Sequence, residues 1–208
     1  MKSYGLCPDS ACLSGGTTSV AEAGSDSIVS WGRWTNGTAK LSFFGVPLSV
    51  TLNQNQGMHY LVGTPVVSVP TSGTFSYDLL GATKPTDRSG MAAAGTFTGQ
   101  AVVLFGPGQA AKVGLSAQVS INGNNYGINT IGGVAQPQQS QVQLNSTYSF
   151  SADLNSGLTG ASCQAGSHCS VNVSGGLFGA QGQRLGLSYT LSPGTTQSKI
   201  DGVAVFKR

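Results

Sequence analysis

The C-terminal stretch Ser170-Val-Asn-Val-Ser-Gly-Gly-Leu-Phe-Gly-Ala-Gln-Gly-Gln-Arg-Leu-Gly-Leu-Ser-Tyr-Thr-Leu191, followed by Gly202-Val-Ala-Val-Phe-Lys207, carries the clearest structural pattern of the chain. Apolar residues alternate in it with small polar ones, which is the period-two pattern of strands with one buried face. Between the first two strands, the glycine-rich segment 175–179 suits a tight bend where backbone approaches backbone. These segments predict the end of an antiparallel β-barrel.

The same alternation recurs upstream. We expect further strands at 28–34, 59–62, 73–79, 95–105, 112–121, 126–131 and 147–153. The most regular is Lys112–Ile121, which the turn at 122–125 joins to the next strand as a hairpin. Its inward positions are predicted to be Val113, Leu115, Ala117, Val119 and Ile121. The apolar segment Leu41–Leu52 is interrupted by Gly45 and Pro47, so we expect an irregular plug or flap there. Residues 132–146 are predicted to form a polar loop.

Strands at this spacing imply an all-β sandwich or barrel, and the repeated interior glycines favour a strongly curved sheet. We therefore predict an antiparallel barrel of about eight strands with long irregular loops. Residues 1–26 lack periodicity and are expected to form a disordered or loosely packed leader or linker, followed by a single barrel domain at 27–208. The last strand, with Val203 and Val205, is expected to return to the strand of Trp31.

Composition narrows the class of protein. Charged residues make up 8% of the 208 positions, 31 residues are glycine, and the net charge is +3. The basic residues stand singly, so no run favours nucleic-acid binding. No apolar stretch is long enough for a membrane-spanning helix. Met1–Tyr4 lacks the apolar region of a signal peptide, so we expect the chain to follow a removed signal or an upstream domain, with a cytosolic protein as the alternative.

The four cysteines form two close pairs, Cys7 with Cys12 and Cys163 with Cys169. Small loops closed by local disulfides are the simplest interpretation in an oxidising compartment. A zinc site would need to combine both pairs, neither of which has two-residue spacing. Zinc and free thiols remain the alternatives, because spacing alone does not determine connectivity.

The C-terminal motif also resembles a known family. Gly175-Gly-Leu-Phe-Gly-Ala-Gln-Gly-Gln-Arg-Leu-Gly-Leu-Ser-Tyr189 is similar to the signature G-x-F-F-G-P-x-A-x-E-x-G-G-x-F that ends the barrels of transferrin-binding-protein-B-like surface lipoproteins. The final segment 200–207 resembles their closing strand. The pattern of 31–37, 57–65 and 73–77 is similar to a barrel domain appended to iron-dicitrate sensor (FecR-type) proteins of Gram-negative bacteria. This chain has Leu177, Ala180 and Arg184 where the family signature has Phe, Pro and Glu.

The sequence offers little catalytic chemistry. Its two histidines, His59 and His168, adjoin a strand and a cysteine loop, and the seven acidic residues are isolated from one another. Neither a hydrolytic triad nor a carboxylate pair is indicated, so we predict that the protein is not an enzyme. Phe43 and Phe44 point to opposite faces if extended, so one of them is a candidate for partner contact. If haem is bound, His59 or Tyr60 is the candidate axial ligand.

We therefore predict a non-catalytic binding module that presents loops on a rigid barrel. The resemblance implies the periplasm or outer-membrane surface of a Gram-negative bacterium, a protein partner there, and an iron- or haem-related ligand. The alternative is a structural or adhesion subunit that assembles through edge strands or surface loops.

Overall fold

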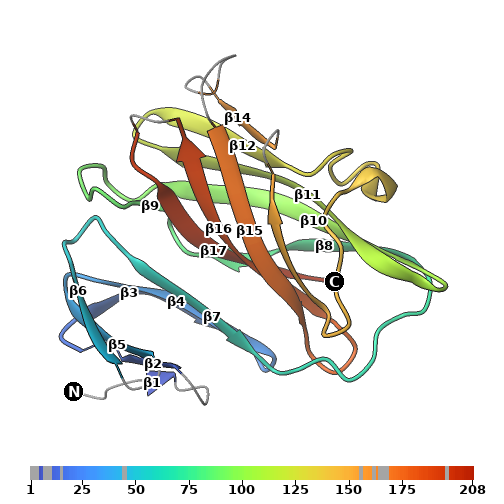
Figure 1. Cartoon of the computed structure of the whole chain (residues 1–208), viewed down its shortest axis with the longest axis horizontal. Coiled ribbons are helices and arrows are strands. Elements are labelled where there is room, and N and C mark those ends of the chain that lie inside the picture. The colour runs from blue at the N-terminus through green and yellow to red at the C-terminus, as the bar shows by residue number, and fades with distance from the viewer. Residues whose placement is uncertain are drawn as a thin grey trace.

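The computed structural model describes residues 5–6, 11–14, 16–43, 46–154, 157–160, 163, 169–194 and 197–208. Its described part consists of strands, turns and one short 3-10 helix, η1 (Pro137–Gln139). The strands belong to three sheets, all of whose pairings are antiparallel. Figure 1 shows the large sheet curled on itself and the two smaller N-terminal sheets beside it.

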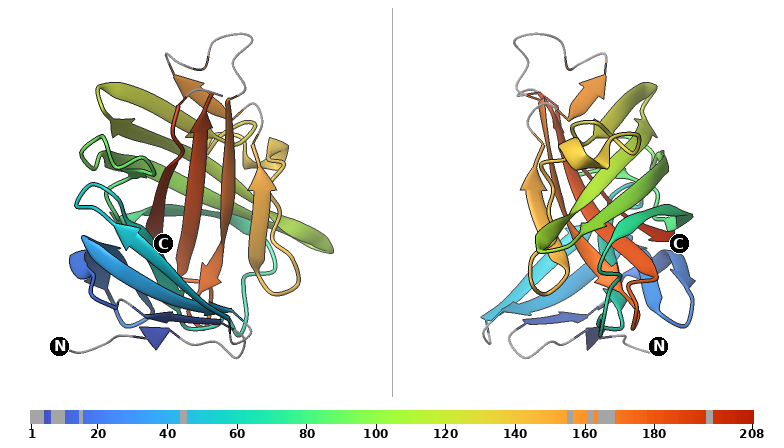
Figure 2. Two further views of the ribbon diagram at one scale, coloured as in Figure 1. Left: turned by 60° about the vertical axis from the view of Figure 1, so that its left-hand side comes forward. Right: turned by 90° about the vertical axis from the view of Figure 1, so that its right-hand side faces the viewer.

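The large sheet contains the C-terminal two thirds of the chain. Nine of its strands follow the order β13-β15-β16-β17-β8-β10-β11-β12-β14, and β9 pairs with β17. Their bounds are β8 Gly73–Ala82, β9 Thr86–Asp87, β10 Thr96–Gly106, β11 Gln109–Ile121, β12 Asn124–Asn129, β13 Ser149–Asp153, β14 Leu158–Gly160, β15 Cys169–Phe178, β16 Arg184–Pro193 and β17 Ile200–Lys207. The prediction of an all-β antiparallel barrel is confirmed, in the form of a curled half-barrel sheet (Figure 2).

Backbone hydrogen bonds extend the pairings at both ends of this strand order. The Leu154 N–H donates to the Val171 carbonyl of β15 at 2.7 Å, and the Asn129 N–H of β12 donates to the Gly157 carbonyl at 2.8 Å. Residues 154 and 157 lie on the connection from β13 to β14, and the Gly157 N–H donates to the Leu154 carbonyl at 3.0 Å. The chain therefore passes along this connection from the first strand of the order to the last.

The interior of the curled sheet is the main hydrophobic core. The predicted inward face of β11 is confirmed: Val113, Leu115, Val119 and Ile121 are at most 5% exposed. Aromatic rings fill the space between opposite walls, as where Phe97 of β10 stacks on Tyr189 of β16 with centroids 5.2 Å apart.

The Gln-rich segment 132–146 is more than a polar loop. Val142 and Leu144 are 2% and 4% exposed and belong to the core, although the segment around them is polar. The Leu144 N–H donates to the Ala111 carbonyl at 2.8 Å, and the Val113 N–H donates to the Val142 carbonyl at 3.0 Å. The segment thus runs along the start of β11 and covers an end of the barrel interior.

The N-terminal strands form two smaller sheets. One has the order β3-β4-β7, with bounds β3 Ser19–Ser25, β4 Val29–Thr35 and β7 Met58–Gly63. The other has the order β1-β2-β5-β6, with bounds β1 Gly5–Leu6, β2 Ala11–Ser14, β5 Gly37–Phe43 and β6 Val46–Leu52. Residues 19–25 therefore form a strand, mostly exposed, inside a segment for which the sequence predicts none.

The segment Leu41–Leu52 also differs from its prediction. It is not an irregular plug, because it forms most of the regular hairpin β5–β6 with continuous pairing from Gly37–Leu52 to Phe43–Val46. Pro47 is tolerated because β6 is paired with β5 on one side only within the described residues. Val46 and Leu48 are 66% and 52% exposed, so the hairpin carries apolar side chains in solvent rather than in the barrel.

The three-stranded sheet packs face to face on the barrel wall. Val29 and Trp31 of β4 form a second buried cluster with Val203 and Val205 of β17. The closing strand therefore contacts the strand of Trp31, as predicted, but through side chains. Its backbone pairs with β16 and β8, because β8 is the first strand of the large sheet. The division of the chain at residue 26 and a single domain at 27–208 stay predictions.

Candidate binding site at the barrel end

A hollow of about 560 Å³ lies at one end of the barrel. It is formed where the β9–β10 connection, the β11–β12 turn and the β16–β17 connection converge, at the upper left of Figure 1. Its lining residues are Asp87, Ser89, Met91, Ala92, Ile121, Asn122, Asn124, Tyr126, Gln197, Ser198 and Ile200. A cavity of this size, built from loops on a rigid sheet, is the usual form of a ligand site.

Polar contacts hold the β9–β10 connection in place. The Arg88 guanidinium forms a two-pronged ion pair with Asp201 of β17, with Nε–Oδ2 and Nη2–Oδ1 distances of 2.5 and 2.8 Å. The Ser89 N–H donates to the hydroxyl of Ser198 at 3.0 Å and to Asp87 at 2.9 Å. Bidentate arginine–carboxylate pairs fix orientation as well as distance. The loop is therefore attached to the start of β17 rather than free in solvent.

Asp87 is the one carboxylate in the lining, and its donors come from the surrounding loops. Burial alone would raise the pKa of this carboxyl, but hydrogen bonds from Ser198, Ser89 and the Ala92 backbone lower it below the usual value. The carboxylate thus organises its own loop. The protein's own hydrogen-bond donors therefore already compensate the charge of this carboxylate.

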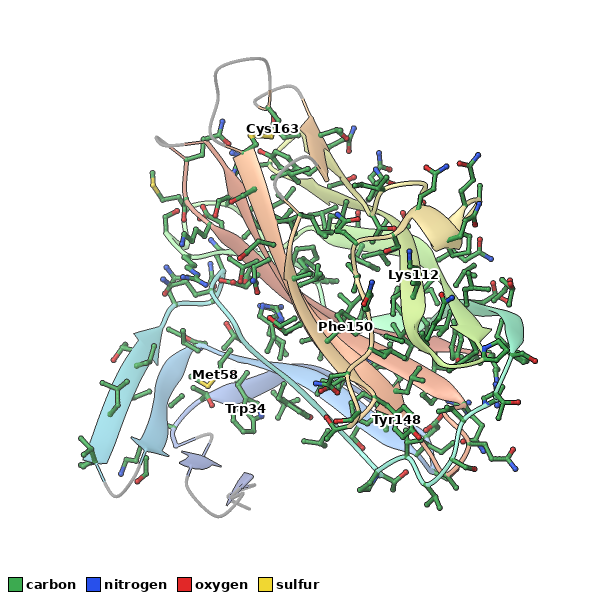
Figure 3. All side chains as sticks on the ribbon, turned by 45° about the vertical axis from the view of Figure 1, so that its right-hand side comes forward. Trp34, Met58, Lys112, Tyr148, Phe150 and Cys163 are labelled. Carbon is green, nitrogen blue, oxygen red and sulfur yellow. A yellow bond between two sulfur atoms is a disulfide. The ribbon has the colours of Figure 1, made fainter. Side chains whose placement is uncertain are left out.

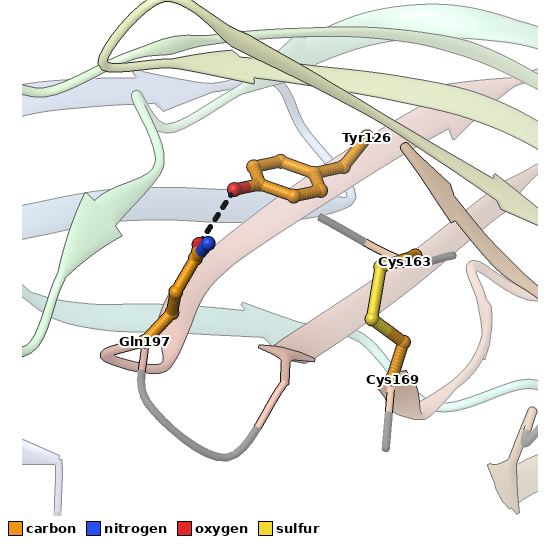
Figure 4. Close-up of a disulfide and its surroundings, with 4 residues drawn as sticks. All are labelled: Tyr126, Cys163, Cys169 and Gln197. Carbon is orange, nitrogen blue, oxygen red and sulfur yellow. Dashed lines mark hydrogen bonds between the residues drawn. A yellow bond between two sulfur atoms is a disulfide. The ribbon is translucent and has the colours of Figure 1, made fainter. Parts of the chain in front are cut away.

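The β16–β17 connection is tied to the floor of the hollow. The Tyr126 hydroxyl of β12 donates to Gln197 Oε1 at 3.1 Å, as drawn in Figure 4. The Tyr126 side chain is 2% exposed, so the bond holds Gln197 above a buried ring. Nearby, Cys163 and Cys169 form a disulfide with a Cα–Cα distance of 5.5 Å. This confirms the predicted pairing and removes the zinc and free-thiol alternatives for these two residues.

The tip of the β11–β12 hairpin forms the third side. Asn122 and Gly123 adopt left-handed conformations with φ of 51° and 73°, as a two-residue turn joining twisted strands requires. A second hollow of about 410 Å³ lies on the other side of this tip, between it and residues 93–95. The hairpin tip therefore stands between two hollows, and Asn122 and Asn124 line both of them.

The predicted site residues lie elsewhere. His59 is on β7, between the outer sheet and the barrel, where its Nδ1 and Nε2 are hydrogen-bonded to the hydroxyls of Thr83 and Thr86 at 2.7 and 2.8 Å. Burial lowers the pKa of His59 to about 4; the smaller charge effects of Asp201 and Glu22 raise this pKa, and that of Arg33 lowers it further. The imidazole is neutral at pH 7, and as folded both ring nitrogens are already engaged.

Tyr60 and the two phenylalanines were the other candidates. The Tyr60 ring lies against Trp34 with centroids 5.2 Å apart, and burial raises the pKa of its hydroxyl. Figure 3 shows Trp34 beside Met58, its cross-strand partner in the outer sheet and away from the barrel end. Phe44 and the Phe43 side chain lie outside the described residues, as do Cys7, the Cys12 side chain and His168. The partner-contact role of these residues stays a prediction.

Sequence reasoning did not assign Asn122, Asn124, Tyr126 and Gln197 to a site. The Asn-Gly turn was visible as a hairpin signal, and Tyr126 as the start of a strand. Their convergence with residues 87–92 and 197–200 depends on pairings between distant strands. No local pattern could have identified it.

Within the described ranges, no group of three or more His, Cys, Asp or Glu side chains is arranged to hold a metal ion. None of the helical structure described there is long or apolar enough to cross a bilayer.

The fold is thus an antiparallel barrel-type domain with an outer sheet packed on its wall and a loop-lined hollow at one end. Similar solved structures include the isotype 1 transferrin binding protein B from serogroup B Neisseria meningitidis, with 17% identity and a TM-score of 0.46. A mutant of transferrin binding protein B from Haemophilus parasuis Hp5 is similar with 14% identity and a TM-score of 0.46. Intact transferrin binding protein B with N and C lobes is similar with 12% identity and a TM-score of 0.37.

These matches cover 99% of this chain but only 34% to 37% of the other proteins. The chain spans about a third of their length. No family model and no curated protein matches the chain. The solved structures are of the class that the C-terminal motif resembles, and the similarity concerns the fold.

Proposed function

We propose that the protein is a non-catalytic binding module of the bacterial cell envelope whose barrel-end loops contact a partner. The observation that supports this most directly is the hollow itself, whose loops are held by the Arg88–Asp201 ion pair and the Tyr126–Gln197 hydrogen bond. Loops that are held in position before binding lose little conformational entropy when a partner arrives. Such a design serves recognition, and the described residues of the lining include no histidine or cysteine for nucleophilic chemistry.

The disulfide supports an extracytoplasmic location. Cys163 and Cys169 are joined, and disulfides persist mainly in oxidising compartments. The low proportion of charged residues, 8%, and the wealth of neutral polar ones suit an envelope protein. By the resemblance of its C-terminal motif, the partner belongs to iron or haem acquisition. His59 does not support a haem site, because both of its nitrogens are hydrogen-bonded.

A binding assay with defined probes tests the proposal. The chain is immobilised and exposed to iron-loaded transferrin, iron-free transferrin, haemoglobin and haem in turn. The variant Asn124→Arg places a bulky charge in the rim of the hollow, and Gln109→Arg is the matched control on an exposed residue at the opposite barrel end. We expect one protein probe to bind wild type and control equally and the Asn124→Arg variant at least about tenfold more weakly. Equal binding by wild type and both variants would place the contact elsewhere on the protein. If none of the four probes binds, the proposal of an iron-related partner fails.

A second candidate function rests on β6. This strand is paired on one side only within the described residues, and it exposes Val46 and Leu48. An edge strand with apolar side chains is a surface on which a neighbouring chain can pair, although Pro47 removes one N–H. Assembly through β6 would make the protein a structural or adhesion subunit.

Light scattering over a concentration series distinguishes the two functions. Assembly through β6 predicts that the mass rises with concentration, that Leu48→Lys abolishes the rise, and that Val67→Lys does not. Val67 is a suitable control because it is 80% exposed and lies in the β7–β8 connection. A wild-type chain whose mass is constant across the series argues against the assembly function.

A further inference from the structure

The two hollows at the barrel end lie on either side of the β11–β12 turn, and together they are called the barrel-end groove. Both are lined by Ile121, Asn122 and Asn124, so they meet at the hairpin tip. Their volumes of about 560 and 410 Å³ are each in the range of small-molecule sites. A groove of two joined hollows suits an extended ligand with two or more units better than a single compact one.

The groove is almost uncharged. Among the described residues, its combined lining contains no Lys, Arg, Glu or His, and Asp87 is the one acid there. That carboxylate is already compensated by donors from Ser89, Ser198 and the Ala92 backbone. Recognition of a phosphate, sulfate or carboxylate uses cationic or backbone donors, and recognition of a cation uses free carboxylates. The described lining offers neither cationic side chains nor an uncompensated carboxylate, which favours a neutral ligand.

Side-chain amides are the main polar groups of the lining. Asn122, Asn124, Asn125 and Gln197 stand around the hairpin tip and the β16–β17 connection. Gln197 uses Oε1 to accept the Tyr126 hydroxyl, and Asn125 uses Oδ1 to accept the Ser120 hydroxyl at 2.5 Å. In both cases the orientation leaves the NH₂ group to point away from the internal partner. An amide offers donors and an acceptor side by side, which matches a pair of neighbouring hydroxyl groups.

Apolar side chains complete the lining. Met91 is 88% exposed at the rim, and Ile121, Ile200 and Ala92 form the wall below it. A flexible thioether side chain adapts its shape to an irregular apolar surface. A ligand that combines hydroxyl groups on its edges with C–H faces satisfies both parts of the lining, and a sugar ring has this character.

The backbone around the groove is less suited to a peptide. Extended peptides are commonly captured by an exposed strand edge, whose main-chain groups supply the hydrogen bonds. Here β11 is paired on both sides, with β10 and β12, and β12 is paired with β11 and β14. The main-chain groups of β11 beside the groove are therefore used within the sheet, whereas β12 pairs with β14 only from Tyr126 to Ile128. Side-chain amides and hydroxyls are the groups that the lining offers for recognition.

We propose that the barrel-end groove binds a neutral glycan chain, with the amides of Asn122, Asn124, Asn125 and Gln197 contacting sugar hydroxyls and Met91 contacting a sugar face. This rests on the proposed function, because it names the chemistry that the same barrel-end loops recognise. A partner glycoprotein or a cell-surface polysaccharide would each supply such a chain. Free oligosaccharides carry the sugar hydroxyls and sugar faces that both sources have in common, so they are the direct probe.

Amide chemical shifts of the full chain, isotope-labelled, provide the test. The probes are neutral trisaccharides of glucose, galactose and N-acetylglucosamine, titrated into the millimolar range, with sialyllactose and an uncharged extended peptide for comparison. We expect one neutral saccharide to shift the signals of residues 121–125 and 197–200. The double variant Asn124→Ala/Gln197→Ala should bind it at least about tenfold more weakly, since about 1.4 kcal/mol of hydrogen bonding is removed. Gln109→Ala, at the other barrel end, is the control that should bind normally.

Each other outcome overturns the proposal. A neutral glycan is excluded if none of the saccharides shifts the amide signals. It is also excluded if sialyllactose binds preferentially, or if only the peptide causes shifts. Equal affinity of the double variant and wild type would place the sugar elsewhere. The proposed function fails separately: if a protein probe loses binding to Asn124→Arg while saccharides have no effect, the barrel-end function stands and the glycan inference fails. The spectrum of the double variant, unchanged outside the groove, shows that it is folded.

Discussion

Replacing Gly81 by alanine should destabilise the protein through the contact between the outer sheet and the barrel. A Cβ at Gly81 would lie 2.3 Å from Trp31 Cζ2 and 2.8 Å from Cε2. Ordinary contacts begin at 3.4 Å, so the ring or the strand must move by 1.1 Å (3.4 minus 2.3). Trp31 has little room to move, because the same Cζ2 atom lies 2.3 Å from the Cβ position of Gly24. The indole is thus confined by glycines of two different sheets.

The expected cost follows from overpacking of a well-filled interior, which is about 1–3 kcal/mol for one added methyl group. Taking about 2 kcal/mol, a chain of this length should lose about 4–8 °C in Tm. Gly106→Ala is the matched control. Gly106 is also a strand residue, has no atom within 4 Å of its Cβ position, and does not adopt a left-handed conformation. Its substitution should change stability by less than about 0.5 kcal/mol.

Chemical denaturation of wild type, both single variants and the double variant Trp31→Phe/Gly81→Ala measures these values. The smaller ring of Trp31→Phe removes the atoms that clash. The double variant should therefore be more stable than the sum of its two single changes predicts, by about 1 kcal/mol or more. If Gly81→Ala is as stable as Gly106→Ala, or if the two changes are additive, the close packing of the outer sheet on the barrel is refuted.

The remaining predictions concern other contacts. The pKa of His59 is lowered from 6.5 to about 4, so the unfolded chain binds more protons than the folded chain between these pH values. The free energy of unfolding should therefore fall as the pH drops from 6.5 to 4, by on the order of 3 kcal/mol in total. In urea titrations at several pH values, His59→Gln should remove this pH dependence, and an unchanged dependence would assign it to another group. Reducing the Cys163–Cys169 disulfide, or replacing both cysteines by serine, should cost about 2 kcal/mol in the free energy of unfolding, because the bond closes a short loop; calorimetry showing no loss would contradict the constraint. Glu22→Gln should lower the free energy of unfolding by about 2 kcal/mol, because it leaves the buried Arg33 cation without its carboxylate partner at 2.6 Å. Denaturant unfolding measures this loss, and an unchanged stability would mean that water compensates the guanidinium.

Much of the secondary structure was predictable, because alternation is a local property. Val113 to Ile121 alternate so regularly that the inward face of β11 could be named, and all but Ala117 of that set are fully buried. The turn at Asn122–Gly123 was predictable as well, because Asn and Gly adopt the left-handed conformation of such turns more readily than other residues. The pairing of Cys163 with Cys169 was the simplest interpretation of their short separation, and the structure confirms it.

Other features could not be predicted for identifiable reasons. The hairpin β5–β6 was hidden because Gly45 and Pro47 suggest an interruption, yet an edge strand tolerates proline. The burial of Val142 and Leu144 could not be predicted, because two apolar residues in a polar segment are too few to define an alternating pattern. His59 was a reasonable metal-ligand candidate by residue type, and only the positions of Thr83 and Thr86 revealed that its nitrogens are engaged.

The sequence by itself determined most of the strands of the large sheet, where most of the tight turns lie and which face of β11 is apolar. Those properties depend on residues a few positions apart, through backbone dihedrals and side-chain alternation. The tertiary structure alone decided that β17 pairs with β8, that the strand of Trp31 lies on the outside of the barrel wall, and that Asn122, Tyr126 and Gln197 meet at one end. Many strands offer similar apolar faces and equivalent backbone groups. Their choice of partner is therefore settled by the packing of the whole chain, such as a ring fitting over a glycine, which no local pattern records.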